Sequence, residues 1–303
     1  MDTNISSEIL KKVRQVEIKT NRLVDDTLSG HYRSVFRGRG MDFDEVREYV
    51  PGDDVRTIDW NVTARTGRTF VKKFTEEREL TIMLIIDVSA SGEFGSSSQS
   101  KLEIIAELGS VLAFSAVRNN DKVGLILFTE EVELYIPPAK GRSHILRLIR
   151  EILFFQPAGR GTDFVAALDF ANQVIRRRAV VFLISDFCLP GDFSASLEGL
   201  RPKLMITNRH HDLIAVSVND PREREMPDIG LLNIEDSETG EQVELDTTRS
   251  EIMDHFTQLA DERHGELSRS IRSCGVDFLK LSTDKAYLPV LLNFFNSRER
   301  RRN

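Results

Sequence analysis

The chain has 303 residues, which is more than a typical single domain needs and suits one main domain with appendages. Hydrophobic residues make up 40% and charged residues 29%, as in ordinary soluble globular proteins and unlike disordered or membrane-embedded ones. The formal net charge of −7 argues against a nucleic-acid-binding protein that depends on a positive overall potential.

The two cysteines indicate a reducing compartment. Cys188 and Cys274 lie far apart and form no CxxC pair, so neither a disulfide framework nor a thiolate zinc site is expected. The N-terminal text MDTNISSEILKK lacks the pattern of a signal peptide, and apolar runs such as LTIMLII are much shorter than the ~20 residues of a membrane helix. We therefore expect a cytoplasmic protein without direct membrane insertion.

The first 79 residues differ in character from the rest. Residues 5–29 have apolar positions at helical spacing and predict an amphipathic helix that stops at Gly30. Residues 31–79 are short segments rich in Arg, Asp and Gly, with a Pro51-Gly52 turn signal in the middle. The sequence predicts an N-terminal helix and arm over residues 1–79, followed by a main domain over residues 80–303.

Charged residues of alternating sign crowd the arm. They would form either a docking surface for an ATPase or an internal set of ion pairs that fixes the arm to the core, and we favour ion pairs because close opposite charges usually satisfy one another. Trp60 is most simply a buried anchor. The charged residues concerned are Arg47, Glu48, Asp53, Asp54, Arg56, Asp59 and Arg65.

From residue 80 onward, short apolar runs such as TIMLIID, KVGLILFT and AVVFLISD alternate with amphipathic helical segments. Apolar runs without polar alternation are typical of parallel strands covered by helices on both faces, so the predicted fold is α/β with a doubly wound, mostly parallel sheet. A strand, turn and strand pattern predicts a β-hairpin insertion at about 222–250. A helix over 251–273 and the strand GVDFLKLST follow, and the basic tail with Arg298, Arg300, Arg301 and Arg302 is expected to be a solvated end.

Oxygen-bearing side chains follow three of the predicted elements of the sheet domain. Asp87, Ser89 and Ser91 follow the first strand, Thr162 opens a later helix after the loop QPAGRG, and Asp186 ends the strand AVVFLIS. Each has a simple alternative role as a helix cap or loop residue. Ligands of open parallel sheets bind beyond the carboxyl ends of the strands, however, and an oxygen-only shell there suits a hard divalent cation.

This pattern resembles the metal-ion-dependent adhesion site of von Willebrand factor A domains. The DxSxS motif, the Thr in a Gly-rich loop and the Asp after the fourth strand are represented by Asp87, Ser89, Ser91, Thr162 and Asp186. The resemblance implies a bound Mg²⁺ or Mn²⁺ with one open position that a Glu or Asp of a protein partner fills. Ala90 and Gly92-Glu93 depart from the usual residues of the family, and Glu93 would be an internal ligand if it reached the metal.

Two further segments resemble a bacterial family called domain of unknown function 58, whose members join such an arm to a von Willebrand factor A-like domain. The segments are REYVPGDDVRTIDW in the arm and DPREREMPDIGLLNIEDSETGE in the insertion. The resemblance implies a non-enzymatic adaptor that works with a MoxR-type AAA+ ATPase as a chaperone or in the assembly of protein complexes.

Two alternatives stay open. One is a divalent-metal-dependent hydrolase of phosphate or ester substrates; a haloacid-dehalogenase-like phosphatase is disfavoured because Ser89 stands where that family needs a second Asp. No GxSxG elbow, Walker motif or GxGxxG motif opens a helix in the sequence. The other alternative is a vestigial metal site in a protein that binds through its arm alone.

Overall fold

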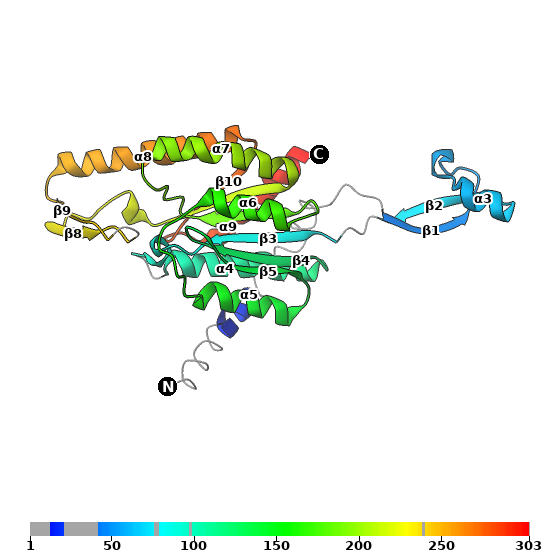
Figure 1. Ribbon diagram of the computed structural model, residues 1–303, viewed down its shortest axis with the longest axis horizontal. Coiled ribbons are helices and arrows are strands. Elements are labelled where there is room, and N and C mark those ends of the chain that lie inside the picture. The colour runs from blue at the N-terminus through cyan, green and yellow to red at the C-terminus, as the bar shows by residue number, and fades with distance from the viewer. Residues whose placement is uncertain (1–12, 21–41, 76–78, 97–98, 238–239, 303) are drawn as a thin grey trace. The chain divides into compact units, whose positions relative to one another are not determined.

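The computed structural model describes residues 13–20, 42–75, 79–96, 99–237 and 240–302. Two compact units are present (Figure 1): Phe36–Leu80 forms one, and the rest of the chain forms the main unit. Each unit is considered by itself below. No helix in the described parts of the chain is both long and apolar enough to span a bilayer.

The main unit is built on a six-stranded sheet with the strand order β10-β7-β6-β3-β4-β5. All neighbours are parallel except β4 and β5, so the predicted doubly wound, mostly parallel sheet is confirmed. The strands are β3 (Thr81–Asp87), β4 (Lys122–Phe128), β5 (Val132–Ala139), β6 (Val180–Ser185), β7 (Asp212–Asn219) and β10 (Asp277–Ser282).

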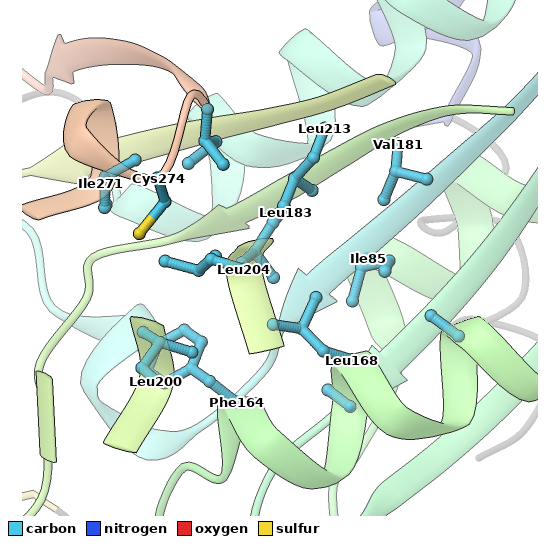
Figure 2. Close-up of a cluster of buried hydrophobic side chains, with 14 of the residues drawn as sticks. Ile85, Phe164, Leu168, Val181, Leu183, Leu200, Leu204, Leu213, Ile271 and Cys274 are labelled. Atoms are coloured by element: carbon cyan, nitrogen blue, oxygen red, sulfur yellow. The ribbon is translucent and has the colours of Figure 1, made fainter. Parts of the chain in front are cut away.

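Helices cover both faces of this sheet (Figure 1). Met83 and Ile85 of β3 point into a core formed with α6, α7 and α8, where Leu168 and Leu204 also lie (Figure 2). Residues of opposite parity on β3, such as Leu84, face α4 and α5. The helices are α4 (Lys101–Arg118), α5 (Arg142–Phe154), α6 (Phe164–Val174), α7 (Phe193–His210), α8 (Ser250–Ser273) and α9 (Tyr287–Arg302).

Two elements of the sheet domain have no counterpart in the sequence prediction. Strand β5 contains Pro137 and Pro138, which obscure its strand pattern and which an edge strand tolerates. Helix α7 contains Pro202 in its interior, where proline normally breaks a helix. In both elements, the prolines hid the strand or helix pattern in the sequence, although the fold tolerates them at these positions.

Residues 13–20 are helical, as predicted, and bury Val13, Glu17 and Thr20. Glu17 pairs with Arg142 of α5, and Lys19 pairs with Glu107 of α4. The helix thus belongs to the main unit, whereas the sequence prediction placed it with the arm. The other residues of the predicted helix lie outside the described parts of the chain.

The smaller unit pairs β1 (Asp42–Glu48) with β2 (Phe70–Thr75) in an antiparallel ribbon and adds η2 (Val55–Thr57) and α3 (Trp60–Thr66). Part of the predicted set of ion pairs is present within this unit. Arg47 donates two hydrogen bonds to Asp53, and Arg68 pairs with Glu48. Asp54 and Asp59 cap η2 and α3 with their side chains.

Trp60 does not have its predicted role as a buried anchor. It is the first residue of α3, and 69% of it is exposed to solvent. None of the residues of α3 is buried, so this short helix gives Trp60 no packed interior to enter.

The predicted hairpin insertion is present as β8 (Leu231–Glu235) and β9 (Gln242–Asp246), which pair with each other in a separate two-stranded sheet. In the basic tail, Arg300 and Arg301 are exposed, as predicted for a solvated end, but Arg298 is not. The tail continues α9, and Arg298 is buried while its guanidinium pairs with Asp212 of β7 and Asp277 of β10. Ion pairs of Arg298 therefore link the C-terminal helix α9 to strands β7 and β10.

We predict that Arg298→Ala lowers the free energy of unfolding by about 3 kcal/mol, because it removes the buried cation that Asp212 and Asp277 share, whereas Asp277 keeps its pairing with the exposed Arg301. Chemical denaturation followed by circular dichroism measures the change. Arg300→Ala on the exposed side of α9 is the control and should change stability by less than about 0.5 kcal/mol. Equal stability of the two variants would contradict this role of Arg298.

Candidate metal centre

The candidate site lies where the strand order of the sheet reverses. The chain proceeds from β3 outward to β4 and β5 and then returns to place β6 on the other side of β3. In doubly wound folds, ligands bind in the crevice beyond the strand ends at this point. Asp87 is the last residue of β3 and Asp186 directly follows β6, so the topology brings these two carboxylates together.

Four of the five predicted metal ligands line one small cavity. They are Asp87, Ser89, Ser91 and Asp186, and the remaining wall is formed by Gly92, Lys101 and Ile105. Thr162, the fifth predicted ligand, is not among the lining residues. The structure thus assembles the two carboxylates and the two serine hydroxyls and leaves Thr162 in the adjoining loop.

The two serine hydroxyls have a spacing that suits a small cation. Ser89 Oγ and Ser91 Oγ lie 3.0 Å apart. Two neighbouring ligands of an octahedral ion with bonds of ~2.0–2.1 Å are separated by about 2.9 Å. The donor atoms are all oxygen, as Mg²⁺ and Mn²⁺ prefer. The residues therefore fit a magnesium or manganese site with Ser89 and Ser91 in adjacent positions.

Asp87 is held firmly at the bottom of the site. One carboxylate oxygen accepts the Ser89 N–H at 2.9 Å, and the other accepts the Ser185 hydroxyl at 2.7 Å. Burial raises the pKa of Asp87 to about 6, with a further contribution from the negative charge of Asp186, although these hydrogen bonds act in the opposite direction. A nearby divalent cation would offset both effects.

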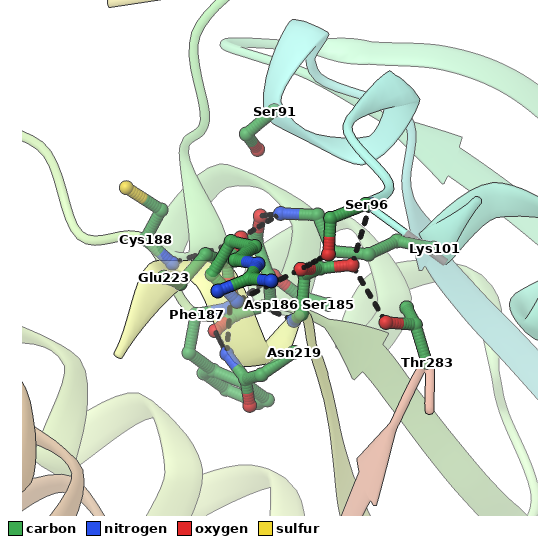
Figure 3. Close-up of polar contacts among 12 residues, drawn as sticks. Ser91, Ser96, Lys101, Ser185, Asp186, Phe187, Cys188, Asn219, Glu223 and Thr283 are labelled. Carbon is green, nitrogen blue, oxygen red and sulfur yellow. Dashed lines mark hydrogen bonds and ion pairs between the residues drawn. The ribbon is translucent and has the colours of Figure 1, made fainter. Parts of the chain in front are cut away.

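Asp186 already has a cationic partner, as Figure 3 shows. The Lys101 ammonium, at the start of α4, lies 2.6 Å from Asp186 Oδ2 and also pairs with Glu223. Burial opposes the charge of Lys101, but the two carboxylates outweigh it and raise its pKa above the usual value. The ammonium is thus charged at neutral pH and forms part of the cavity wall.

The loop that carries Thr162 is shaped by two glutamates. Glu133 accepts the N–H groups of Ala158 and Gly159, and Glu130 accepts those of Arg160 and Gly161. These backbone hydrogen bonds lower the pKa of Glu130, and they lower that of Glu133 in spite of its partial burial.

This shaped loop reaches the metal-site segment directly. Its Arg160 carbonyl accepts the Ala90 N–H at 3.0 Å, between the two serines of the site. Thr162, two residues after Arg160, is buried.

An aromatic stack ties the Thr162 loop to the Asp186 loop. Phe164, two residues after Thr162, stacks on Phe187 with ring centroids 5.2 Å apart. Phe187 has a φ of 58°, in the left-handed region that a bulky residue rarely adopts. Ser185 Oγ accepts the Phe187 N–H and helps to hold this conformation. The strained residue thus lies next to Asp186, as is common at functional sites.

Sequence analysis missed three contributors to the site: Lys101, Ser185 and Glu223. One signal for Lys101 is available, because a lysine at the first position of a helix opposes the helix dipole and needs a compensating acid. Nothing local indicates that Glu223 reaches the site from the end of β7. The side chain of Glu93, considered as an internal ligand, lies outside the described residues.

Within the described residues, no group of three or more His, Cys, Asp and Glu side chains is placed to hold a metal. The predicted site has only two carboxylates and depends on hydroxyls for its other protein ligands. Metal binding by Asp87, Ser89, Ser91, Thr162 and Asp186 accordingly stays a prediction.

Comparison with known families identifies the chain. The family described as Protein of unknown function DUF58 matches residues 45–266. The chain belongs to the DUF58 family. Among its relatives, the Uncharacterized protein Rv1480 of Mycobacterium tuberculosis is 32% identical over 290 residues, which are 95% of this chain and 89% of that protein. The Uncharacterized protein YeaD of Bacillus subtilis is 27% identical over 107 residues, 35% of this chain and 25% of YeaD.

Solved structures similar to this DUF58 chain include the conserved hypothetical protein BatB from Bacteroides thetaiotaomicron, with a TM-score of 0.47, 16% identity and coverage of 73% of this chain and 99% of BatB. The SpRpn10 VWA domain has a TM-score of 0.40 and 15% identity, over 71% of this chain and 94% of that domain. These TM-scores lie below 0.5, so the structural similarity carries no argument here. The fold of the DUF58 chain is established by its own strand order.

We predict that Gly159→Ala destabilises the protein by about 1–3 kcal/mol, the usual cost of forcing atoms into a filled space. A Cβ at this position would collide with the Glu130 carboxylate and the Thr129 side chain, which shape the Thr162 loop. Gly199→Ala in α7 is the matched control, since its Cβ would meet open space, and it should raise stability by up to about 1 kcal/mol. Thermal unfolding distinguishes them, and an unchanged Gly159→Ala protein would contradict the loop geometry.

We predict a pH-dependent penalty from Asp87 in protein freed of divalent ions with a chelator. Its folded pKa of about 6 exceeds the ~3.9 of an unfolded Asp, so the unfolded chain ionises first and stability falls as the pH rises from about 4 to about 6. Relative to Asp87→Asn, the wild type should lose roughly 3 kcal/mol across this range. Urea unfolding at each pH measures the difference, and parallel curves for the two proteins would refute it.

Proposed function

We propose that this DUF58 chain is a non-enzymatic binding protein that uses a Mg²⁺ or Mn²⁺ in the candidate site to capture a carboxylate of a protein partner. The observation that carries the proposal is the 3.0 Å spacing of Ser89 Oγ and Ser91 Oγ in a cavity shared with Asp87 and Asp186. Neighbouring metal ligands have this spacing, and carboxylates and hydroxyls are ligands that hard cations accept.

The charges of the site support capture of an anion. Asp87 and Asp186 together neutralise a divalent ion, while Ser89 and Ser91 contribute no charge, so the bound ion would supply Lewis acidity toward an incoming carboxylate. Lys101 and Glu223 form a pair that adds no net charge. The side chains thus balance the ion without saturating it with negative charge.

The surroundings of the hydroxyls favour binding over covalent catalysis. Ser89 and Ser91 hydrogen-bond to each other, and no histidine is among the residues that line the cavity. A nucleophilic serine needs a positioned base within hydrogen-bonding distance. The carboxylate that the Ser89 side chain contacts is that of Asp87, itself a proposed metal ligand, which supports a role of these hydroxyls as ligands.

We further propose that the partner is a protein with an acidic side chain and that a MoxR-type AAA+ ATPase works with this chain in the assembly or chaperoning of protein complexes. This part rests on the resemblance of the arm and the insertion to their counterparts in the family. We also propose a cytoplasmic location, with no nucleic acid and no direct membrane insertion involved.

We predict that Mn²⁺ binds the protein at one site and that Ser89→Ala weakens this binding at least about tenfold, because even indirect disturbance of a metal ligand costs that much. Titration followed by electron paramagnetic resonance of free Mn²⁺ measures the affinity. The control is Asp261→Asn, which removes an exposed carboxylate on α8 that is paired with Arg224, and its affinity should equal that of the wild type.

Capture of the partner is tested by pull-down of the MoxR-type ATPase from the same organism. Recovery should require Mg²⁺ or Mn²⁺ and should fall with Ser89→Ala but not with Asp261→Asn. Equal recovery with and without metal, and for both variants, would reject metal-dependent capture. Steady turnover of a generic phosphoester that is lost on Asp186→Ala would instead support a hydrolase.

A further inference from the structure

Lys101 occupies an unusual place for a lysine. It is the first residue of α4, where the helix dipole disfavours a positive charge, and only 1% of its side chain is exposed. Lysine is almost never fully buried unless it is paired. Its ammonium pairs with Asp186 and Glu223 and lies 5.8 Å from the centre of the Phe94 ring. These contacts fix the charge within the wall of the candidate metal site.

The Lys101 ammonium donates a hydrogen bond to one of the two carboxylate oxygens of Asp186. Asp186 Oδ1 accepts the Cys188 N–H at 3.0 Å, whereas Oδ2 lies 2.6 Å from Lys101 Nζ. Lys101, Asp186 and the two serines all line the same cavity. Two cations at one carboxylate oxygen repel each other strongly at such distances. Lys101 is therefore positioned to compete with any divalent ion for Asp186.

Glu223 is the second ion-pair partner of Lys101, and it does not line the cavity. Its Oε1 pairs with the ammonium, while its Oε2 accepts the N–H of Asp220 at 3.0 Å in a capping box of the 3-10 helix η4 (Pro221–Glu223). The Asp220 carboxylate is in turn anchored by hydrogen bonds from Ser96 and from Thr283. Glu223 is thus fixed in place by contacts that do not involve the Asp186 carboxylate, and it can retain the ammonium alone.

We propose that Lys101 is the resident counterion of Asp186 and sets the divalent-ion affinity of the site by an exchange: Asp186 releases the ammonium when it becomes a metal ligand, and Lys101 stays paired with Glu223. This inference rests on the proposed metal site. It assigns Lys101 as a positioning residue that offsets part of the negative charge of the site without metal and lowers its affinity for metal.

Mn²⁺ affinity of Lys101→Met tests the exchange. The affinity should rise at least about tenfold over the wild type, since one competing charge is removed from within a few ångströms of the ion. Arg160→Met is the matched control: it removes a positive charge from an exposed side chain of the neighbouring loop, outside the residues that line the cavity, and should change affinity by less than about threefold. Thermal unfolding confirms that both variants fold.

The wild-type protein provides a second readout that needs no substitution. The ¹⁵N signal of the Lys101 ammonium, assigned by its loss in Lys101→Met, should shift when Mg²⁺ is added, as its contact with Asp186 gives way. Addition of the same concentration of Na⁺ should leave it unchanged.

The outcomes separate this inference from the proposed function. Tighter Mn²⁺ binding by Lys101→Met together with a Mg²⁺-dependent shift supports the exchange. Mn²⁺ binding by Lys101→Met but not by the wild type also supports the exchange and shows that the ammonium prevents metal binding in the wild-type site. Equal affinities of the two proteins would overturn the exchange and leave the metal site intact. Binding by neither protein would overturn both.

Discussion

The structure depends most on the burial of two carboxylates side by side at the end of the central sheet. Asp87 and Asp186 lie at the strand ends that flank the switch point, and the charge of Asp186 contributes to the raised pKa of Asp87. Buried like charges are costly unless a cation offsets them. Lys101 supplies one positive charge, which Glu223 shares. Negative charge of the Asp87 and Asp186 pair therefore remains uncompensated and favours binding of a further cation. This uncompensated charge is the basis of the proposed metal site.

The remainder of the fold holds this charge cluster in one geometry. The strand order brings β3 and β6 together, the Phe164–Phe187 stack links the loops after them, and Glu130 shapes the loop between. Asp220 joins the segment after β3 to the ends of β7 and β10 through Ser96 and Thr283. Five separate segments thus meet at the site, and each is anchored by contacts of its own. Such support is what a preorganised binding site requires.

Much of this could be predicted from the sequence, because the relevant signals are local. Apolar runs ending in polar residues locate β3 and β6, and the position of strand ends in an α/β sheet then brings Asp87 and Asp186 together. Lys101 and Glu223 could not be assigned in this way, since their pairing joins residues 122 positions apart and no periodic pattern records it. The exposure of Trp60 and the burial of Arg298 were mispredicted for a related reason. Burial depends on what the fold places opposite a residue, which neither its type nor its nearness to a chain end reveals.

The central claim is that a bound divalent ion neutralises the negative charge of the Asp87 and Asp186 carboxylates. Anomalous diffraction at the manganese edge, from crystals grown with MnCl₂, tests it most directly. The account predicts one strong peak within bonding distance of the Ser89 and Ser91 hydroxyls, with the Lys101 ammonium moved away from Asp186 and retained by Glu223. A cavity without a peak, in which Lys101 and Asp186 remain paired at saturating Mn²⁺, would contradict the account.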